Sequence, residues 1–510
     1  MDYLMGIDLG STSLKAIVYD SQGTAVATGS RPTERFHPNP DKPEWTVWEP
    51  DQIWGGVAAA ARDAVAKLDD PGGIKGVAVT GMGMDGVPVD EDGKWLYPFI
   101  SWHDPRTVPQ FDWWRENVTF EKTFSIGGNP VWAINSCMRI LWMAEHEPDI
   151  LAKTHKWLLI EDFVNMMLCG RMVTDYSMAS CTALFDQKKL DWSDELLNLS
   201  GIDRELMPEV LPSGTPVGEI HAEASSATGI PEGTPVVLGG HDHICGALPV
   251  GVFRPGTVLN VTGTWETVLT AAEQPELKDE LRQMGVTVQA HVARGMHAVW
   301  GSNAASEMVE WYRKQFGHEA RQKADNDVDR EWEHFIASAA ESPVGARGVM
   351  FLPHMSAVAC PVVDEHSAGA FIGLKNTASA GDMLRAVFEG LCFQTRDVAT
   401  ALGSGLAVGM DRFVAVGGAI RNEFWMQCKA DVMGRPVEVP DVEEATPMGA
   451  AIMAGIGTGV FKDETDALDR VYREGKVFQP NPEAAAKYDE LFKIYKQIYP
   501  AISPISHQLG

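Results

Sequence analysis

Apolar residues near the start of the chain fall into two short runs that are separated by a glycine turn. Residues 3–8 and 14–20 read as two strands, and Gly10-Ser-Thr forms the turn between them. Residues 50–68 read as a helix, because a proline and an aspartate open the segment and alanine-rich apolar positions continue it. Residues 74–80 follow as a buried strand. This order of hairpin, helix and strand predicts a mixed α/β sheet with helices on its faces.

A second region of the chain repeats this pattern. Residues 257–261 and 267–272 again read as strands, with the turn Gly263-Thr264 between them. The shared order predicts a duplicated architecture, with a boundary at about 248–255, where prolines and glycines interrupt the apolar pattern. A chain of 510 residues is also too long for a single hydrophobic core. The two expected domains are residues 1–250 and residues 251–510.

The charge of the chain excludes one class of partner. The formal net charge is -28, and a nucleic-acid partner would require Lys and Arg clusters, which are missing. Any ATP must therefore be held by local donors and Mg²⁺ rather than by a broad positive field. The 45% hydrophobic and 22% charged residues are ordinary for a globular enzyme.

The cysteines and the apolar segments indicate the compartment. The seven cysteines are scattered and never in CxxC spacing, which fits reduced thiols rather than a disulfide framework. The first residues lack the basic and apolar regions of a secretory signal, and no window reaches the roughly 18 apolar residues of a membrane span. We expect a cytoplasmic protein with no membrane partner, for which a homodimer is one assembly to consider.

One carboxylate, Asp242, stands at the end of the apolar run that begins at Pro235. A carboxylate at a strand end, beside a loop of backbone N–H groups, can deprotonate a hydroxyl while the loop holds a phosphate. The flanking His241 and His243, with Cys245 close by, also raise a metal interpretation, although no fourth ligand or second cluster is apparent. A structural aspartate at a strand end is the remaining alternative.

Asp8 and the turn after it form a candidate phosphate site. Glycine permits close backbone approach, hydroxyls and N–H groups can bind phosphate oxygens, and Asp8 can orient a hydrated Mg²⁺. The alternative is an ordinary β-turn with serine and threonine as turn formers. Two such turns, at Gly10 and at Gly263, together with one base suggest a kinase that acts on an alcohol.

A dinucleotide motif is also present. Gly81-Met-Gly-Met-Asp-Gly86 matches GxGxxG and follows a strand, but a dinucleotide site requires a helix next. Residues 87–95 instead carry a proline, an alternating stub and an Asp-Gly turn, which predict a hairpin. No GxxxxGK[ST] segment occurs in the chain, so a P-loop kinase is excluded.

Two further segments could form the walls of a site. Residues 413–422 read as a strand that ends in glycines, and Asn422 can cap a helix that runs to about Met433. A helix that starts beside glycines could bind the adenine and ribose of a nucleotide. Residues 446–455 read as a small-residue helix that could pack close by; tight strand–helix packing is the alternative for both. In the first domain, two segments could contact a sugar: Met84-Asp85 and Trp102-His-Asp104. They offer a stacking ring and carboxylates that could bind vicinal hydroxyls. The alternative is that the tryptophan is a core residue and the aspartates are solvated.

Together these segments resemble the FGGY carbohydrate kinases. Residues 369–374 followed by 382–390 fit the spacing of that family's C-terminal signature. The resemblance covers nearly the whole chain and implies an α/β protein of two actin/hexokinase-like (ribonuclease H-like) domains with an interdomain cleft. The matching motifs, in chain order, are Gly6-Ile-Asp-Leu-Gly-Ser-Thr12, Trp102-His-Asp104, Gly240-His-Asp242, Gly263-Thr264, Gly417-Gly-Ala419 with Asn422, and Thr446-Pro-Met-Gly-Ala450.

The resemblance also implies residue roles. Asp242 would be the catalytic base and Asp8 would lie at the Mg²⁺–phosphate site, so ATP and Mg²⁺ are the expected cofactors. The nucleotide-binding residues would be Gly10, Ser11, Thr12, Lys15, Gly263, Thr264, Gly417, Gly418 and Asn422. The substrate-binding residues would be Met84, Asp85, Trp102, Asp104, Asp242 and His243.

The chain departs from the family pattern at several positions. Met84-Asp85 replaces the Met-His pair of xylulokinase-like members, and His243 stands where Asn or Gln is common. Residues 356–361 lack the usual Glu and Arg, and Arg139 stands where Lys is usual. These departures argue against xylulose and glycerol as substrates. Asp85 and Asp104 would repel an acidic sugar, so we expect a neutral, hydroxyl-rich ligand.

The expected function is ATP-dependent phosphorylation of a sugar or polyol, a ketose or an alditol, at a primary hydroxyl. The substrate would bind in the interdomain cleft against the first domain, and ATP would be held mainly by the second. One alternative is an actin-fold ATPase or acyl-phosphate-forming kinase without a sugar. The other is a catalytically weak sugar-binding regulator, which the missing Glu and Arg would suit.

Overall fold

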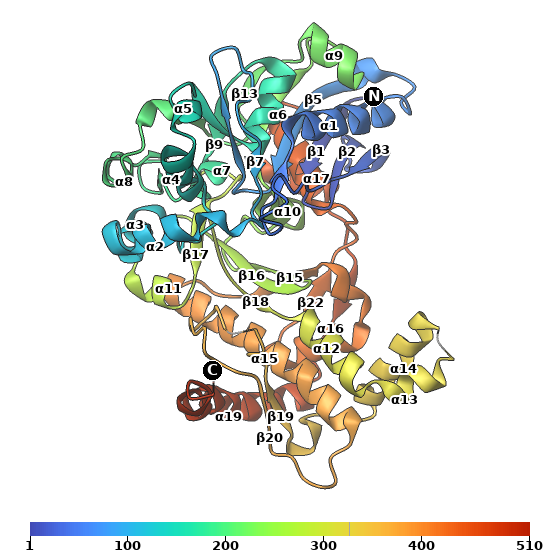
Figure 1. The fold of residues 1–510 in the computed structure, drawn as a ribbon. Coiled ribbons are helices and arrows are strands. Elements are labelled where there is room, and N and C mark those ends of the chain that lie inside the picture. The colour runs from blue at the N-terminus through green and yellow to red at the C-terminus, as the bar shows by residue number, and fades with distance from the viewer. Residues whose placement is uncertain (326, 357, 510) are drawn as a thin grey trace.

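Two mixed β-sheets, one in each half of the molecule, organise the fold (Figure 1). The computed structural model describes residues 1–325, 327–356 and 358–509. The first sheet has the strand order β13-β14-β5-β1-β2-β3 and the second has the order β17-β18-β16-β15-β21-β22-β23. The first sheet comprises β1 (Tyr3–Leu9), β2 (Ser13–Asp20), β3 (Ala25–Pro32), β5 (Ile74–Gly81), β13 (Pro216–Glu219) and β14 (Pro235–His241). The second comprises β15 (Thr257–Thr262), β16 (Trp265–Ala272), β17 (Thr287–Ala290), β18 (His297–Ala304), β21 (Arg412–Val416), β22 (Val437–Val439) and β23 (Lys476–Phe478).

The two sheets share one topology. In the first, β1 pairs antiparallel with β2, β2 antiparallel with β3, and β5 lies parallel to both β1 and β14. In the second, β15, β16 and β18 form the antiparallel part, and β21 lies parallel to both β15 and β22. The duplicated architecture expected from the sequence is therefore confirmed.

Helices cover both faces of the first sheet. Side chains of β1 alternate, so that Met5, Ile7 and Leu9 join the core under α1 (Pro50–Val65) and α6 (Ile160–Cys169). Leu4 belongs to a second core on the opposite face. Because both faces of β1 are covered, nearly every residue of this strand is apolar.

The opposite face of the first sheet is covered by α17 (Ala445–Gly457), which comes from the far end of the chain. Figure 1 shows this orange-red helix against the blue strands β1 and β2. Two glycines permit the contact: a Cβ on Gly6 would lie 1.8 Å from the carbonyl oxygen of Pro447, and a Cβ on Gly449 would lie 1.9 Å from that of Cys245. The small-residue helix expected near an adenine thus packs on the first domain's sheet.

Three long helices surround the second sheet: α15 (Ala380–Leu406), α16 (Glu423–Met433) and α19 (Pro482–Ser506). Asn422 caps α16 and Gly434 ends it in a left-handed conformation, as the sequence predicts. The terminal helix α19 is capped by Asn481 and runs through Pro500 and Pro504.

Shorter elements complete the fold. The remaining helices are α2 (Val108–Asn117), α3 (Phe120–Gly127), α4 (Ser136–His146), α5 (Pro148–Leu151), α7 (Tyr176–Ser180), α8 (Asp194–Ser200), α9 (Ala222–Thr228), α10 (Asp242–Ala247), α11 (Asp279–Gln283), α12 (Ser306–Phe316), α13 (His318–Lys323), α14 (Val328–Ala340) and α18 (Glu464–Val471). The remaining strands are β4 (Val47–Trp48), β6 (Gly86–Val89), β7 (Phe99–Ile100), β8 (Lys156–Leu159), β9 (Val173–Asp175), β10 (Phe185–Asp186), β11 (Asp191–Trp192), β12 (Glu209–Leu211), β19 (Met350–Leu352) and β20 (Ala370–Ile372). The segment after the GxGxxG motif turns back on itself, with Val89 bridged antiparallel to Trp95, so no helix follows that motif.

Within the residues that the structure describes, no helix combines the length and the apolar character that crossing a bilayer requires. The cytoplasmic location stays a prediction, as do the domain limits.

Candidate active site

Asp242 lies at the junction where β14 ends and α10 begins. Glycine is required just before it, because a Cβ on Gly239 would lie 1.9 Å from the carbonyl oxygen of Val79 on the neighbouring strand. Oδ1 of Asp242 accepts a hydrogen bond of 2.6 Å from the backbone N–H of His243. The carboxylate is thus held in place at the start of α10.

Buried polar groups hold the backbone of this junction. The N–H of His241 donates to Oγ of Ser177 at 2.9 Å, and that hydroxyl donates to Oδ1 of Asp175 at 2.5 Å. The N–H of Gly239 donates to Oε1 of Glu161 at 3.2 Å. Burial raises the pKa of Glu161 well above its ordinary value, and Asp175 nearby raises it further. These contacts fix the strand end from which Asp242 projects.

A cavity of about 530 Å³ opens beside Asp242, between the two halves of the molecule. Ser11 of the first glycine turn and Trp265, the residue after the second turn, both line it, so the base, the first turn and the strand that follows the second turn border one space. Its aromatic walls are Trp102 and Trp132 from the first half and Trp265 and Trp300 from the second. Among the described residues that line it, none is Lys or Arg, and Asp242 is the one carboxylate.

Asp8 lies near the end of β1, opposite Lys15 in the β1–β2 register. The pKa of Asp8 is raised to about 7, first by loss of solvent and then by the negative charges of Asp242 and Glu444, while Lys15 acts in the opposite direction. A divalent cation beside Asp8 would offset this cost of ionising its carboxyl group. Hard oxygen ligands of this kind suit Mg²⁺, so these residues fit the expected ion.

The Lys15 ammonium already has an ion-pair partner in this structure. It forms an ion pair of 2.7 Å with Glu444, just before α17. This pair ties the first glycine turn to the second half of the chain. In the turn itself, Gly10, Ser11 and Thr12 are partly or fully exposed, and Ser11 lines the cavity, whereas the N–H of Gly10 donates to the carbonyl of Ser13 at 3.2 Å.

The second glycine turn joins β15 to β16. Gly263 and Thr264 are accessible, and the chain beyond them is anchored because the N–H of Ala305 donates to the carbonyl of Thr264 at 2.9 Å. Behind the turn, the buried ammonium of Lys429 from α16 contacts Oγ1 of Thr262 at 2.6 Å and a carboxylate oxygen of Glu266. A buried charged network therefore connects this turn to α16.

The glycines after β21 lie beside the same turn. Gly417 has a φ of 99°, and a Cβ there would lie 2.6 Å from the carbonyl oxygen of Thr262. Gly418 has no atom within 4 Å of a Cβ position, so its surface is open. The side chain of Asn422 accepts the N–H of Trp425 at 3.1 Å, which makes it a helix cap in this structure.

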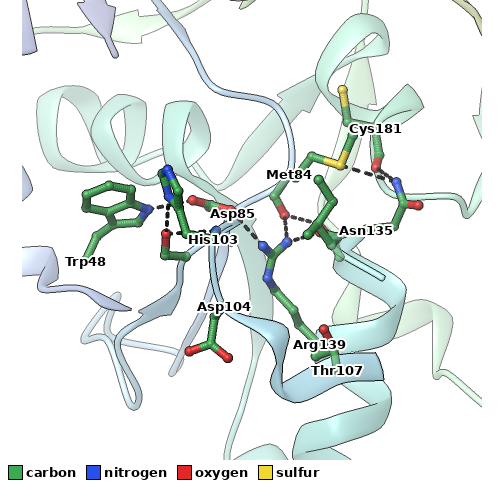
Figure 2. Close-up of polar contacts among 12 residues, drawn as sticks. Trp48, Met84, Asp85, His103, Asp104, Thr107, Asn135, Arg139 and Cys181 are labelled. Carbon is green, nitrogen blue, oxygen red and sulfur yellow. Dashed lines mark hydrogen bonds and ion pairs between the residues drawn. The ribbon is translucent and has the colours of Figure 1, made fainter. Parts of the chain in front are cut away.

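Asp85 does not line the cavity, contrary to the expectation that it contacts the substrate. Figure 2 shows its carboxylate between Arg139 and Trp48, which it contacts at 2.8 Å and 2.6 Å. Burial raises the pKa of Asp85, whereas Arg139 and the Trp48 N–H lower it. Met84, the other member of the pair, does line the cavity, and its carbonyl oxygen accepts from Arg139.

Asp104 is likewise turned away from the substrate space. Its carboxylate forms a fully buried ion pair with Arg106 at 2.6 Å and accepts the N–H of Thr46 at 2.6 Å. The expected repulsion of acidic sugars by Asp85 and Asp104 therefore lacks its basis, since both charges are paired with arginines. Trp102 does line the cavity, and its ring stacks on His103 with centroids 3.6 Å apart.

Several cavity residues were missed by motif reasoning. Trp132, Trp265, Trp300 and Gln289 have no local signature, although Trp265 directly follows the second turn. His243 lines the cavity as expected, and His241 lines it too. In the altered segment 356–361, Ala359 lines the cavity, while residue 357 lies outside the described residues.

Two duplicated sheets with a carboxylate and two glycine turns around one cleft define a phosphotransferase of the actin/hexokinase-like class. Models of the FGGY family of carbohydrate kinases match this chain, the N-terminal domain over residues 3–249 and the C-terminal domain over residues 258–458. The chain belongs to the FGGY family of carbohydrate kinases, and it is a carbohydrate kinase. The family and the enzyme class expected from the sequence are confirmed.

Relatives of several specificities resemble the chain over nearly its whole length. An L-fuculokinase of Escherichia coli is 29% identical over 94% of this chain and 98% of its own length. A xylulose kinase of Bacillus subtilis is 28% identical over 98% of this chain and 97% of its own. The crystal structure of xylulose kinase from Rhodospirillum rubrum, 28% identical, superposes with a TM-score of 0.89 over 99% of this chain and 100% of that one. This superposition confirms the expected two-domain fold.

Proposed function

We propose that this kinase transfers the γ-phosphoryl group of ATP to a primary hydroxyl of a neutral ketose or alditol, with Asp242 as general base. The observation that carries the proposal is the position of Asp242, at a strand end on the cavity that Ser11 and Trp265 also line. L-Fuculokinase and xylulose kinases are among the relatives, which supports a ketose in particular.

The chemistry follows from the two carboxylates. Asp242 takes the proton of the sugar hydroxyl as the oxygen attacks the γ-phosphorus, and the bond from that phosphorus to the bridging oxygen of ADP breaks. Mg²⁺, when bound, neutralises the charge of the phosphates. Asp8 would hold the hydrated ion, and the turns at Gly10 and Gly263 would donate N–H groups to phosphate oxygens.

The charge of the cavity supports a neutral substrate. The described lining residues include no Lys or Arg that could pair with a carboxylate or phosphate of the sugar. Asp242 itself repels an anion that comes within a few Å, since the cavity is partly shielded from water. The four tryptophans offer flat apolar faces, and the C–H side of a sugar ring or chain can pack on them.

The decisive experiment is a screen of neutral ketoses, aldoses and alditols for substrate-stimulated ADP release. We expect one ketose or alditol to stimulate it, and Asp242→Asn to lower kcat by at least roughly 10²-fold with only a modest loss of ATP binding. Asp92→Asn, in the exposed turn between residues 90 and 94, is the matched control.

Three other outcomes would speak against the proposal. Near wild-type turnover by Asp242→Asn would remove the base assignment. ADP release that no sugar stimulates would favour the ATPase alternative. A rise in melting temperature with a sugar, without any ADP formed, would favour a sugar-binding regulator.

A further inference from the structure

Three consecutive side chains converge at the base. Nε2 of His241 lies 3.3 Å from Oδ1 of Asp242, and Nε2 of His243 lies 3.9 Å from the same oxygen. The two imidazole planes stand at 88° to each other with centroids 5.3 Å apart. One ligand atom from each of the three residues lies within 4.8 Å of the others. The cluster faces the cavity, because all three residues line it.

These separations are close to those of a metal site. Two ligand atoms bound about 2.1 Å from a tetrahedral zinc ion lie about 3.4 Å apart. The pair formed by His241 and Asp242 already meets this distance, at 3.3 Å. His243 is the outlying ligand, and its side chain is 58% exposed, so it is free to rotate inward by the small amount required.

We propose that His241, Asp242 and His243 form a binding site for a borderline transition-metal ion, represented by Zn²⁺, that is distinct from the Mg²⁺ site. Two imidazoles and one carboxylate with an open fourth position are the ligand set of many cavity-facing zinc sites. A water molecule or a sugar hydroxyl would complete the coordination from the cavity. The lack of a fourth protein ligand among the described residues, which weighs against a structural zinc site, is therefore a normal feature of an open one.

The ligand types separate the two cations. Mg²⁺ prefers oxygen ligands and retains several waters, so the imidazoles of His241 and His243 suit it poorly. Zn²⁺ binds imidazole readily, whereas Asp8 offers it carboxylate alone. Gln289 in the cavity wall could also orient the ring of His241. Oε1 of Gln289 and Nδ1 of His241 are both buried without a hydrogen-bond partner, and an Nδ1–H that pointed to such an acceptor would leave the Nε2 lone pair for the ion.

Occupation of this site would inhibit the kinase. An ion on Oδ1 of Asp242 engages the oxygen lone pairs that would otherwise accept the hydroxyl proton, and it takes up space in the sugar cavity. Zn²⁺ should therefore compete with the sugar and leave the binding of Mg²⁺–ATP unchanged. This inhibitory effect rests on the proposed function, whereas the binding of the ion does not.

Binding is tested first, on the full-length protein without nucleotide or sugar, by titration with Co²⁺. We expect one equivalent to give the visible absorption of a four-coordinate ion, and Zn²⁺ to abolish that absorption by displacement. His243→Asn and Asp242→Asn should each weaken the affinity at least as much as the roughly 10–100-fold that loss of a second-shell partner costs. His318→Asn, which removes an exposed imidazole at the start of α13, is the matched control and should bind as the wild type does.

Inhibition is tested second, at saturating Mg²⁺–ATP. Zn²⁺ should raise the apparent KM for the sugar, and His243→Asn should reduce that effect. The absence of Co²⁺ absorption, or equal affinity in wild type, His243→Asn and Asp242→Asn, would overturn the site. Melting temperatures show which variants are folded. If one of the two variants does not fold, the other still tests the site. A protein that binds Co²⁺ but phosphorylates no sugar would refute the proposed function and retain the metal site.

Discussion

Asp8 and Asp242 are residues of one type to which their surroundings give different tasks. Asp8 is half-buried near the end of β1, and loss of solvent, with the nearby negative charges, raises its pKa to about 7. Asp242 begins α10, where its carboxylate accepts a backbone N–H and borders the cavity. Separating two carboxylates by environment is a common way to assign chemical roles. Here it matches the proposed division between cation binding at Asp8 and proton transfer at Asp242.

The buried carboxyl of Asp8 predicts a pH-dependent stability. Its folded-state pKa of about 7 lies above the ordinary 3.8, so the folded protein holds the proton more tightly than the unfolded chain. Without Mg²⁺, this group lowers the free energy of unfolding as the pH rises from about 4 to about 7. Asp8→Asn should therefore melt at a higher temperature than the wild type at pH 8 and at a similar temperature near pH 4, in thermal scans with EDTA.

The same variant should also lose its response to the cation. Mg²⁺–ATP should raise the melting temperature of the wild type at pH 8 and raise that of Asp8→Asn much less. Parallel pH profiles for the two proteins would show that Asp8 is not the responsible group.

Arg139 provides a second prediction at this scale. Its guanidinium donates to Asp85, to the carbonyl of Met84 and to the carbonyl of Ile134, two of which are cavity residues. A lysine is a point charge and cannot reproduce this fork. Arg139→Lys should lower the free energy of unfolding by about 1–3 kcal/mol in urea titrations and raise the KM for the sugar more than it lowers kcat.

Arg171→Lys is the control for this substitution, because Arg171 forms an exposed ion pair of 3.4 Å with Glu209. Surface pairs of this kind contribute little to stability. An equal loss of stability in both variants would contradict the special role of the buried arginine.

Local chemistry explains which site residues the sequence could identify. Asp242, the first glycine turn and the Asn422 cap depend on neighbours within a few residues, so their patterns are visible in the chain. Asp85 depends on Arg139, 54 residues away, and a carboxylate that looks available for a sugar is paired when the chain folds. Trp300 and Gln289 reach the cavity from a sheet edge whose register no local pattern reveals.

At the scale of elements, the β15–β16 hairpin and α16 are joined through Lys429. Its ammonium is 1% exposed and is surrounded by Asn260, Thr262 and Glu266. Removal of one member of a buried ion pair leaves the other charge unpaired, which costs about 3–5 kcal/mol. The second glycine turn owes its position to this network.

Lys429→Met and Glu266→Gln should each lower the free energy of unfolding by roughly that amount, about 3–5 kcal/mol, in urea titrations. The double variant should lose clearly less than the sum, since neither charge is then left alone. The KM for ATP should rise more than the KM for the sugar, because the turn is proposed to hold the phosphates of the nucleotide. Strictly additive losses would show that the two side chains act independently.

The helices show which structural features can be predicted from the local sequence and which cannot. The α16 segment carries its own start and stop residues, so its limits follow from the chain. The composition of α17, small and apolar on all sides, predicts burial but does not say against which sheet. Its close approach to β1 depends on Gly6, far away in the chain, and its own Gly449 permits the close contact with α10.

At the scale of the whole molecule, α17 interlocks the two halves. It places residues 445–457 of the second half over the face of the first sheet that carries Leu4, Ala78 and Val237. The Lys15–Glu444 ion pair adds a polar contact at the entry of this helix. Neither half of the chain is therefore self-contained.

Residues 1–250 expressed alone should fail to fold cooperatively, because the apolar face under α17 would be exposed to water. Near-ultraviolet circular dichroism and urea unfolding of this fragment should show no cooperative transition. Co-expression of residues 251–510 as a separate chain should restore both by supplying the helix. A sharp transition in the isolated fragment would contradict this reading of the fold.

The position of α17 has a consequence for biosynthesis. A ribosome makes the chain from its first residue, so the strands of the first sheet emerge well before Ala445 does. During most of translation, the face of that sheet that α17 covers is exposed, because α17 has not yet been synthesised. Transiently bare apolar surface is prone to aggregation. The nascent kinase should therefore depend on chaperones that shield this surface until residues 445–457 have left the exit tunnel.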